Sequence, residues 1–411
     1  MRRALLTLGL ATLVAGGTVV AFGPLRAADR PPAPAPSFGL NTVVDAAQRK
    51  TRTAPQDPAA WAQLGTAYVE EARFTADPAL YGKADGAFAT SLRLQPEGNL
   101  AALVGKGALA LAKHEFAQAR DHALAARAID GTHVPLYGVL SDAYLNLGDY
   151  KQAESALQRM LDLGPNVASF LRAAHFFELT GRPSRADEAM SLAMDAAVMP
   201  TDVALTWFRR GELAWHRGLL KDAAEAYAQT LAIVPGFAPG LAARARVSAA
   251  QGDTSAAVKD YTASIARYPN PSVIVELGEL HRRLGDEAAA TRQFSLAASV
   301  LKLSGDRLGL GTYEAAHGDA ARGVRLLRQE FEARDSVEVA DALAWALHKA
   351  GRSKEALGFA AKAARLGTRD ALFAYHRAEI QDALGHAAAA RRERDAARAA
   401  NPYIPAQNPH R

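Results

Sequence analysis

Residues 140–157 read LSDAYLNLGDYKQAESAL, and this stretch decides the fold because its pattern recurs along the chain. Two apolar patterns with helical spacing flank its glycine. A glycine can take positive φ and end one helix, and an acidic residue after it can cap the next. The recurring glycines are separated by 33, 37, 34, 33, 33, 33 and 34 residues, and they are Gly148, Gly181, Gly218, Gly252, Gly285, Gly318, Gly351 and Gly385. A period near 34 residues is the length of one helix–turn–helix unit.

Small residues recur in the same register. When the glycine is numbered position 15 of a unit, position 8 is always Gly, Ala or Ser, as at Gly65, Ser141 and Ala344. Position 20 is small in nine units, for example at Ala153, and position 32 is often Pro, for example at Pro165. Small residues at positions 8 and 20 predict two helices in close contact, and the proline predicts the end of the second helix.

These residues resemble the tetratricopeptide repeat family. Trp61, Leu64, Gly65 and Tyr68 have the spacing that begins the family pattern, and the stretch 140–165 carries nearly a whole unit. The resemblance covers about ten units over residues 58–402, and it implies an all-α, right-handed superhelical solenoid of stacked antiparallel helix pairs. Residues 339–347 and 366–372 also resemble exported bacterial tetratricopeptide proteins whose chemistry is unassigned.

Two units depart from the pattern. The first unit holds about seven extra residues around 74–82. The eighth unit has Arg307 at position 4 and Glu330 at position 27, where the family prefers apolar or small residues. We expect looser packing at both places.

The two ends of the chain differ from the repeats. Residues 1–28 predict an export signal, because Arg2 and Arg3 precede an uncharged run over 4–25, which suits either a cleaved signal peptide or a membrane anchor. Residues 29–37 form a Pro/Ala-rich spacer, and residues 38–57 predict a helix that caps the first unit. The repeats then occupy 58–402, and residues 403–411 predict a disordered tail. We therefore expect an extracytoplasmic protein that is secreted, periplasmic or tethered through residues 4–25.

Composition excludes several classes of function. The 411 residues include no Cys, which excludes disulfides, thiolate catalysis, cysteine-ligated zinc and a lipidated cysteine. The net charge is +5, but three uncompensated arginines lie in residues 1–28, and the most basic stretch, residues 391–398, interleaves acids. We therefore expect no nucleic-acid partner.

The repeat register also predicts where a partner binds. Positions 4, 7, 8 and 11 of the first helix face the second helix, so positions 2, 5, 9 and 12 form the opposite stripe. In the tetratricopeptide family that stripe lines the concave groove where peptides bind. The candidate groove residues are Asp142, His175, Glu178, Phe208, Glu212, Trp215, Arg246, Glu279, Arg282, Trp345, His348, Tyr375 and Glu379.

The four tryptophans separate by register. Trp61 and Trp207 occupy position 4 and are expected in the core, whereas Trp215 and Trp345 occupy groove positions and could anchor a partner. The alternative for the groove tryptophans is that neighbouring units cover them. The Lys and Asn pair with which some family members clamp a terminal carboxylate is not present at positions 5 and 9.

No pattern in the sequence indicates catalysis, a metal or a cofactor. His114 and Glu115 lack the spacing of a zinc helix, and His175, His216 and His348 lie in separate units. The sequence therefore predicts a non-catalytic protein-interaction scaffold that binds a protein or peptide in its groove. An assembly or chaperone-like factor for a cell-envelope complex is the alternative, and an enzyme that uses the repeats to recognise its substrate is a remote one.

Overall fold

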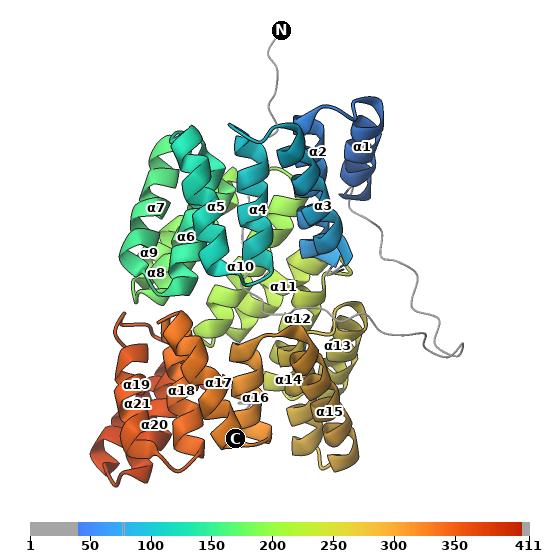
Figure 1. Ribbon diagram of the computed structural model, residues 1–411. Coiled ribbons are helices and arrows are strands. Elements are labelled where there is room, and N and C mark those ends of the chain that lie inside the picture. The colour runs from blue at the N-terminus through green and yellow to red at the C-terminus, as the bar shows by residue number, and fades with distance from the viewer. Residues whose placement is uncertain (1–39, 76, 78, 405–411) are drawn as a thin grey trace.

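The computed structural model describes residues 40–75, 77 and 79–404, and this part of the chain contains twenty-one helices and no strand (Figure 1). The predicted export signal and spacer, and most of the predicted tail, lie outside these residues. The helices are α1 (Leu40–Thr53), α2 (Pro58–Thr75), α3 (Ala79–Leu94), α4 (Leu100–Ala112), α5 (Phe116–Ile129), α6 (Val134–Leu147), α7 (Tyr150–Leu163), α8 (Val167–Leu179), α9 (Pro183–Ala196), α10 (Pro200–His216), α11 (Leu220–Ile233), α12 (Ala238–Ala250), α13 (Thr254–Arg267), α14 (Pro271–Arg283), α15 (Glu287–Ser304), α16 (Arg307–His317), α17 (Ala320–Ala333), α18 (Val337–Lys349), α19 (Ser353–Ala363), α20 (Ala371–Ala383) and α21 (Ala387–Ala400).

The expected all-α solenoid is confirmed. After α1, the helices form ten antiparallel pairs from α2/α3 to α20/α21, each pair being one unit. The turn inside a unit follows the predicted chemistry: Gly148 has φ +87° and ends α6, and the Asp149 side chain accepts a hydrogen bond from the backbone N–H of Gln152 at the start of α7.

The small residues at position 8 bring the two helices of a unit into contact. A Cβ atom added at Gly211 on α10 would lie 2.4 Å from Cε1 of Tyr227 on α11, and one added at Gly65 on α2 would lie 2.5 Å from Cε1 of Phe88 on α3. Tyr227 and Phe88 are fully buried. The large ring of one helix therefore fills the space that the glycine of the other leaves.

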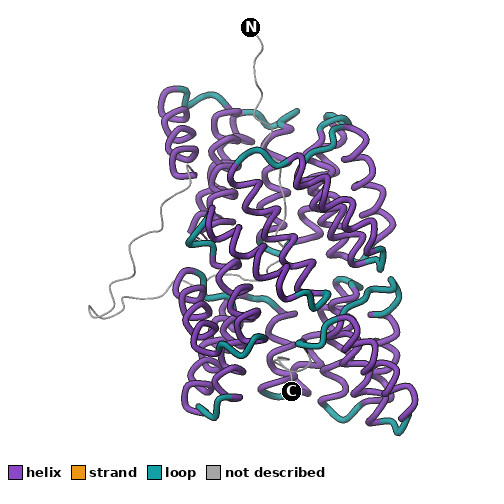
Figure 2. Tube along the Cα trace, turned by 180° about the vertical axis from the view of Figure 1, so that it is seen from behind, coloured by secondary structure: helices purple, strands orange, loops and turns teal. Residues whose placement is uncertain are grey.

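The solenoid winds into two stacked layers. Figure 1 shows α1–α9 in an upper tier and α14–α21 in a lower tier, with α10–α13 running from one to the other, and Figure 2 shows the same two tiers from behind. We call units one to five, with α1, the N-terminal layer and units six to ten the C-terminal layer. The turns inside units three, four and five of the N-terminal layer contact the segments that follow the second helices of units eight, nine and ten.

This interlayer seam consists of the turns at 146–150, 179–182 and 215–218 against the segments 334–337, 367–368 and 401–402. The Val337 N–H donates to the Tyr150 hydroxyl at 2.8 Å. The Thr368 hydroxyl donates to the Leu179 carbonyl, and the Asn401 side-chain amide donates to the Trp215 carbonyl. Each contact joins residues about 187 positions apart in the chain, so the seam repeats with the period of the units.

Turn glycines allow the backbones of the two layers to come close together at the seam. A Cβ added at Gly148 would lie 2.2 Å from the Asp335 carbonyl oxygen, and one at Gly181 would lie 2.2 Å from the Gly367 carbonyl oxygen. Gly252 and Gly351 occupy the same position of their units, also with positive φ, yet a Cβ added there would meet nothing within 4 Å. The turn glycine therefore has a second role only where the two layers meet.

The seam also explains the unusual eighth unit. Arg307 Nε and Glu330 Oε2 form an ion pair at 3.0 Å. This ion pair takes the place of the apolar contact that the family pattern predicts between these two positions. Glu330 Oε1 also accepts from Arg334 Nε at 2.5 Å. The Arg334 side chain is buried, its guanidinium lies 5.0 Å from the centre of the Phe116 ring, and its Nη1 donates to the Asn146 carbonyl at 3.4 Å. The polar residues of this unit thus support contacts with the other layer.

None of the helices among the described residues combines the length and the apolar content that crossing a membrane requires.

Candidate functional site

A pocket of about 640 Å³ opens where the two layers meet. The N-terminal layer contributes one wall from α8, the α8–α9 turn and the end of α10, and the C-terminal layer contributes the other from α18, α20 and α21. The lining residues are His175, Glu178, Leu179, Gly181, Pro183, His216 and Arg217 on the first wall, and Glu338, Thr368, Arg369, Asp370, Phe373, Ala374, Arg377, Ala396, Ala399 and Ala400 on the second.

An ion pair lies on the N-terminal wall. His216 Nδ1 is 3.0 Å from Glu178 Oε1, and the imidazole is 44% exposed. Burial by itself would lower the pKa of His216, but the Glu178 carboxylate and its hydrogen bond, with Glu212 and Asp370 farther away, raise that pKa to about 9. His216 is therefore a cation at neutral pH, and it compensates the charge of Glu178.

His175 stays neutral beside this pair. Burial, the Arg209 guanidinium and the charged His216 lower the pKa of His175 to about 4, and the opposing effect of Glu178 is smaller than their sum. Neighbouring units thus place a neutral and a charged imidazole on the same wall, where each can make a different kind of hydrogen bond.

Two carboxylates lie on the C-terminal wall. Asp370 Oδ1 accepts hydrogen bonds from the backbone N–H groups of Leu372 and Phe373 and so caps α20. Burial raises the pKa of Asp370, and the nearby Asp341 carboxylate adds to that rise. Glu338, in the first turn of α18, is half-buried and forms no ion pair with another described residue. Negative charge on this wall is therefore less compensated than on the other.

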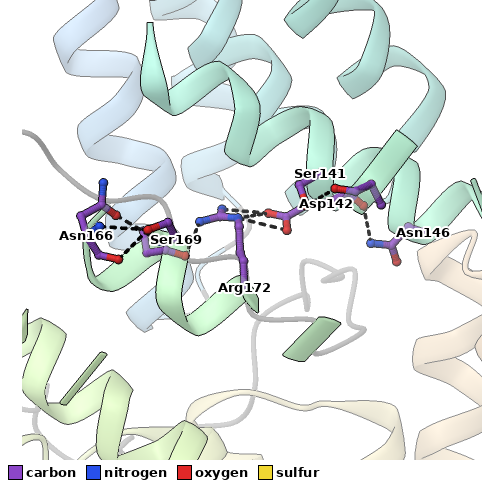
Figure 3. A network of polar contacts seen from close by, with 8 residues as sticks. Ser141, Asp142, Asn146, Asn166, Ser169 and Arg172 are labelled. Atoms are coloured by element: carbon purple, nitrogen blue, oxygen red, sulfur yellow. Dashed lines mark hydrogen bonds and ion pairs between the residues drawn. The ribbon is translucent and has the colours of Figure 1, made fainter. Parts of the chain in front are cut away.

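The predicted groove residues lie in a series of polar networks along the first helices of the units. Asp142 on α6 and Arg172 on α8 form a buried ion pair, with Arg172 Nη2 2.8 Å from Asp142 Oδ2 and Arg172 Nε 3.1 Å from Asp142 Oδ1 (Figure 3). Both residues are less than 10% exposed. Figure 3 also shows the Asn166 and Ser169 capping box that begins α8 one turn before Arg172.

A second network lies on the next units. The Tyr227 hydroxyl donates to Glu212 Oε1 at 2.6 Å, and the Tyr261 hydroxyl donates to Glu276 Oε2 at 2.9 Å. Arg246 lies between the two carboxylates, 2.8 Å from Glu276 Oε2 and 3.9 Å from Glu212 Oε1. Glu212 and Arg246 are thus already used in contacts between units.

Further along, Glu279 is buried between Arg282 and His317, at 2.5 Å from Arg282 Nη2 and 3.5 Å from His317 Nε2. Burial raises the pKa of Glu279, and Arg282 opposes that rise. Glu379 is half-buried and lies 3.4 Å from Arg394 Nη2.

The expected exposure of the large groove aromatics is wrong. Trp215 is 6% exposed, Trp345 is 3% exposed and Phe208 is 4% exposed, so no partner can reach them in this conformation. Trp215 lies in the core beneath the seam, where its carbonyl accepts from Asn401. Phe208 packs edge-on against Phe237 at 5.2 Å. Neighbouring units cover these rings, which was the alternative that the sequence left open.

Trp345 belongs to an aromatic cluster between α18 and α20. Its ring stacks on His376 with 4.2 Å between ring centres, and it also contacts His348 and the half-buried Tyr375. His376 Nδ1 lies 2.7 Å from Asp341 Oδ2. Conversely, Trp61 and Trp207, which were expected in the core, are only half-buried.

Of the thirteen groove candidates, only His175 and Glu178 line the pocket. Sequence reasoning missed the opposite wall, because Glu338 and Asp370 are brought there by the stacking of the layers. Glu338 does occupy position 2 of its unit, on the predicted stripe, whereas Asp370 precedes position 1 and His216 occupies position 13.

The described residues contain no group of three His, Cys, Asp or Glu side chains that could hold a metal ion. Two side chains of the basic stretch of α21 form ion pairs with α20. Glu393 lies 2.8 Å from Arg377, and Arg394 lies 2.9 Å from Asp382.

The fold defines an all-α helical-repeat protein. Residues 110–174 match the family model described as Tetratricopeptide repeat, a stretch that runs from the end of α4 into α8. This match shows tetratricopeptide repeats in residues 110–174, and the remaining helix pairs continue the same register.

Three solved structures are similar to this chain. The human IFIT1 dimer with m7Gppp-AAAA has a TM-score of 0.53 at 15% identity, over 80% of this chain and 76% of that one. The APC/C hetero-tetramer Cut9–Hcn1 has a TM-score of 0.40 at 12% identity, over 88% and 90%. A tetratricopeptide repeat protein from Parabacteroides merdae has a TM-score of 0.33 at 19% identity, over 57% and 93%. The likeness to IFIT1 concerns the fold alone. A comparison of the sequence with curated proteins found no match.

Proposed function

We propose that this protein is a non-catalytic scaffold that acts outside the cytoplasmic membrane and holds a peptide segment of a partner protein in the pocket between its two layers. Tetratricopeptide repeats are protein-interaction modules, and the lining of the pocket combines apolar and charged side chains. The observation that carries the proposal is that the walls of the pocket come from both layers.

The composition of the lining supports a peptide ligand. Leu179, Phe373 and several alanines offer apolar surface, and Glu178, His216 and Asp370 offer a few fixed polar groups. Sites that bind ligands are typically apolar with a small number of such groups. A volume of about 640 Å³ falls in the range of ligand sites.

The export part of the proposal rests on the sequence of residues 1–28. N-terminal sequencing of the protein from fractionated cells tests it. A mature chain that begins after residue 21 or 27 in the extracytoplasmic fraction is the expected result for a cleaved signal, and an intact chain in the membrane fraction is the expected result for an anchor. Recovery of the intact chain in the cytosol would contradict export.

A nucleic-acid ligand such as the RNA of the IFIT1 structure has less support in this chain. Glu178, Glu338 and Asp370 line the pocket, and half-buried carboxylates repel a phosphate backbone. Of the basic groups in the lining, His216, Arg217 and Arg377 are already paired with carboxylates of the protein. We therefore retain a protein partner.

A single alanine allows the pocket to be blocked. Ala399 on α21 is exposed and lines the pocket, whereas Ala388 on the same helix is exposed but does not line it. We expect the full chain with Ala399→Trp to lose the proteins that the wild type captures from an envelope extract, while Ala388→Trp captures them normally. Equal capture by both variants would show that the pocket is not the binding site.

A further inference from the structure

The kind of ligand that the pocket accepts depends on which of its charged side chains already have an ion-pair partner. On the N-terminal wall, Glu178 pairs with His216 at 3.0 Å, and Arg217 pairs with Asp187 at 2.6 Å. On the C-terminal wall, Arg377 pairs with Glu393 at 2.8 Å. These groups have partners and need no ligand.

The remaining charges are Glu338, Arg369 and Asp370. Arg369 is exposed, so water solvates its guanidinium at the rim. Glu338 and Asp370 are half-buried, and neither forms an ion pair with another described residue. Asp370 uses one oxygen, Oδ1, to cap α20. The C-terminal wall therefore carries two half-buried carboxylates without an ion-pair partner of their own, because the nearest cation that acts on Asp370, His216, is paired with Glu178.

Apolar surface lies around these carboxylates. Phe373 and Ala374 follow Asp370 on α20, while Ala396 and Ala400 on α21 and Leu179 on α8 complete the lining. A ligand group that fits both features has a long aliphatic stem and a cationic end. Lysine and arginine side chains have this construction, since they bury their methylene groups and keep the charged head at a polar site.

From this arrangement we infer that the partner segment presents a lysine or arginine side chain to Glu338 and Asp370, with apolar residues of the segment on either side. The inference rests on the proposed function, because it specifies what the same pocket accepts. The basic residue bridges the layers: its head lies against the C-terminal wall, while the flanking residues contact both walls.

Three fluorescein-labelled peptides test the inference by fluorescence anisotropy with the full chain. They are Ala-Leu-X-Leu-Ala amides in which X is lysine, norleucine or glutamate. We expect the lysine peptide to bind about ten-fold tighter than the norleucine peptide, which corresponds to about 1.4 kcal/mol, because its charged end lies beside two half-buried carboxylates. The glutamate peptide should bind most weakly.

Charge-neutral variants provide the controls. Glu338→Gln and Asp370→Asn should each weaken the lysine peptide about three-fold and leave the norleucine peptide unchanged. Asparagine is also a good N-cap, so α20 should remain folded in Asp370→Asn, and its circular dichroism melting curve checks this. Glu188→Gln, on the exposed surface of α9 and outside the pocket, should change nothing.

The outcomes separate this inference from the proposed function. If the lysine and norleucine peptides bind equally and Ala399→Trp abolishes both, the pocket binds peptides but the charge inference is wrong. Tighter binding of the glutamate peptide would also overturn it. If no peptide binds and Ala399→Trp captures proteins as well as the wild type does, the proposed function itself fails.

Discussion

At the scale of single residues, polar side chains in this protein serve packing more often than recognition. Asp142, Glu212, Arg246 and Glu279 occupy the stripe that the register assigns to a groove, yet each is already paired with another side chain of the repeats. A charged residue on the predicted stripe is therefore available to a binding protein only where it forms no ion pair within the chain.

The buried pair of Asp142 and Arg172 gives a direct test of this view. Asp142→Ala should lower the free energy of unfolding by about 3 kcal/mol, because the Arg172 guanidinium is left buried without its carboxylate. The double variant Asp142→Leu with Arg172→Met should recover most of that loss, since neither residue then carries a buried charge. Urea denaturation of the wild type, Asp142→Leu, Arg172→Met and the double variant measures the coupling. Simple addition of the two single losses would argue against a structural pair.

The two pocket histidines predict opposite responses to pH. The pKa of His216 is raised to about 9, above its ordinary value of 6.5, so its ion pair stabilises the fold fully below pH 6.5 and loses this contribution as the pH rises through 9. Because water screens a side chain that is 44% exposed, we expect a loss of about 1 kcal/mol between pH 6.5 and 9.5. The pKa of His175 is lowered to about 4, so His175 favours the folded state above pH 6.5, and this contribution is lost as the pH falls toward 4.

NMR titration of the histidine ring protons measures both values. A His216 ring that titrates near 6.5 would contradict the ion pair with Glu178. Glu178→Gln should lower the His216 pKa toward 6.5, and Glu188→Gln serves as the control.

At the scale of elements, the repeat register predicted the helices because each unit carries its own turn and packing signals. Gly148 and Asp149 specify one turn, and Gly211 with Tyr227 specifies one helix contact, all within a single unit. The eighth unit was harder to interpret. Its Arg307 and Glu330 violate the local pattern, and the reason lies in the other layer, which no property of that unit alone could reveal.

The turn glycines test the seam with matched controls. Gly148→Ala and Gly252→Ala both place alanine at φ near +87°, so both should lose about 1 kcal/mol from backbone strain. Only at position 148 does the new methyl group meet the Asp335 carbonyl, which should cost about 1–3 kcal/mol more. Urea denaturation checks the difference. Equal destabilisation would mean that the seam contributes nothing to stability.

At the scale of the whole molecule, the sequence could not predict how the layers meet. Each unit rotates slightly against the previous one, and the stacking depends on the sum of these small rotations over about five units. That sum determines that Trp215 is covered and that Glu338 and Asp370 face Glu178 and His216. Reasoning from the repeat therefore found only His175 and Glu178 among the lining residues, and the opposite wall required the superhelix.

The stacking of the two layers is the central claim, and a distance measurement across the seam tests it most directly. The chain has no native cysteine, so spin labels can be placed specifically at Ser155→Cys on α7 and Glu332→Cys on α17, both exposed. Double electron–electron resonance on the labelled full chain without a partner should give one narrow distance distribution, unchanged by Gly252→Ala and broadened by Gly148→Ala. A broad distribution in the otherwise wild-type chain, extending to the distances of an open solenoid, would contradict the closed arrangement.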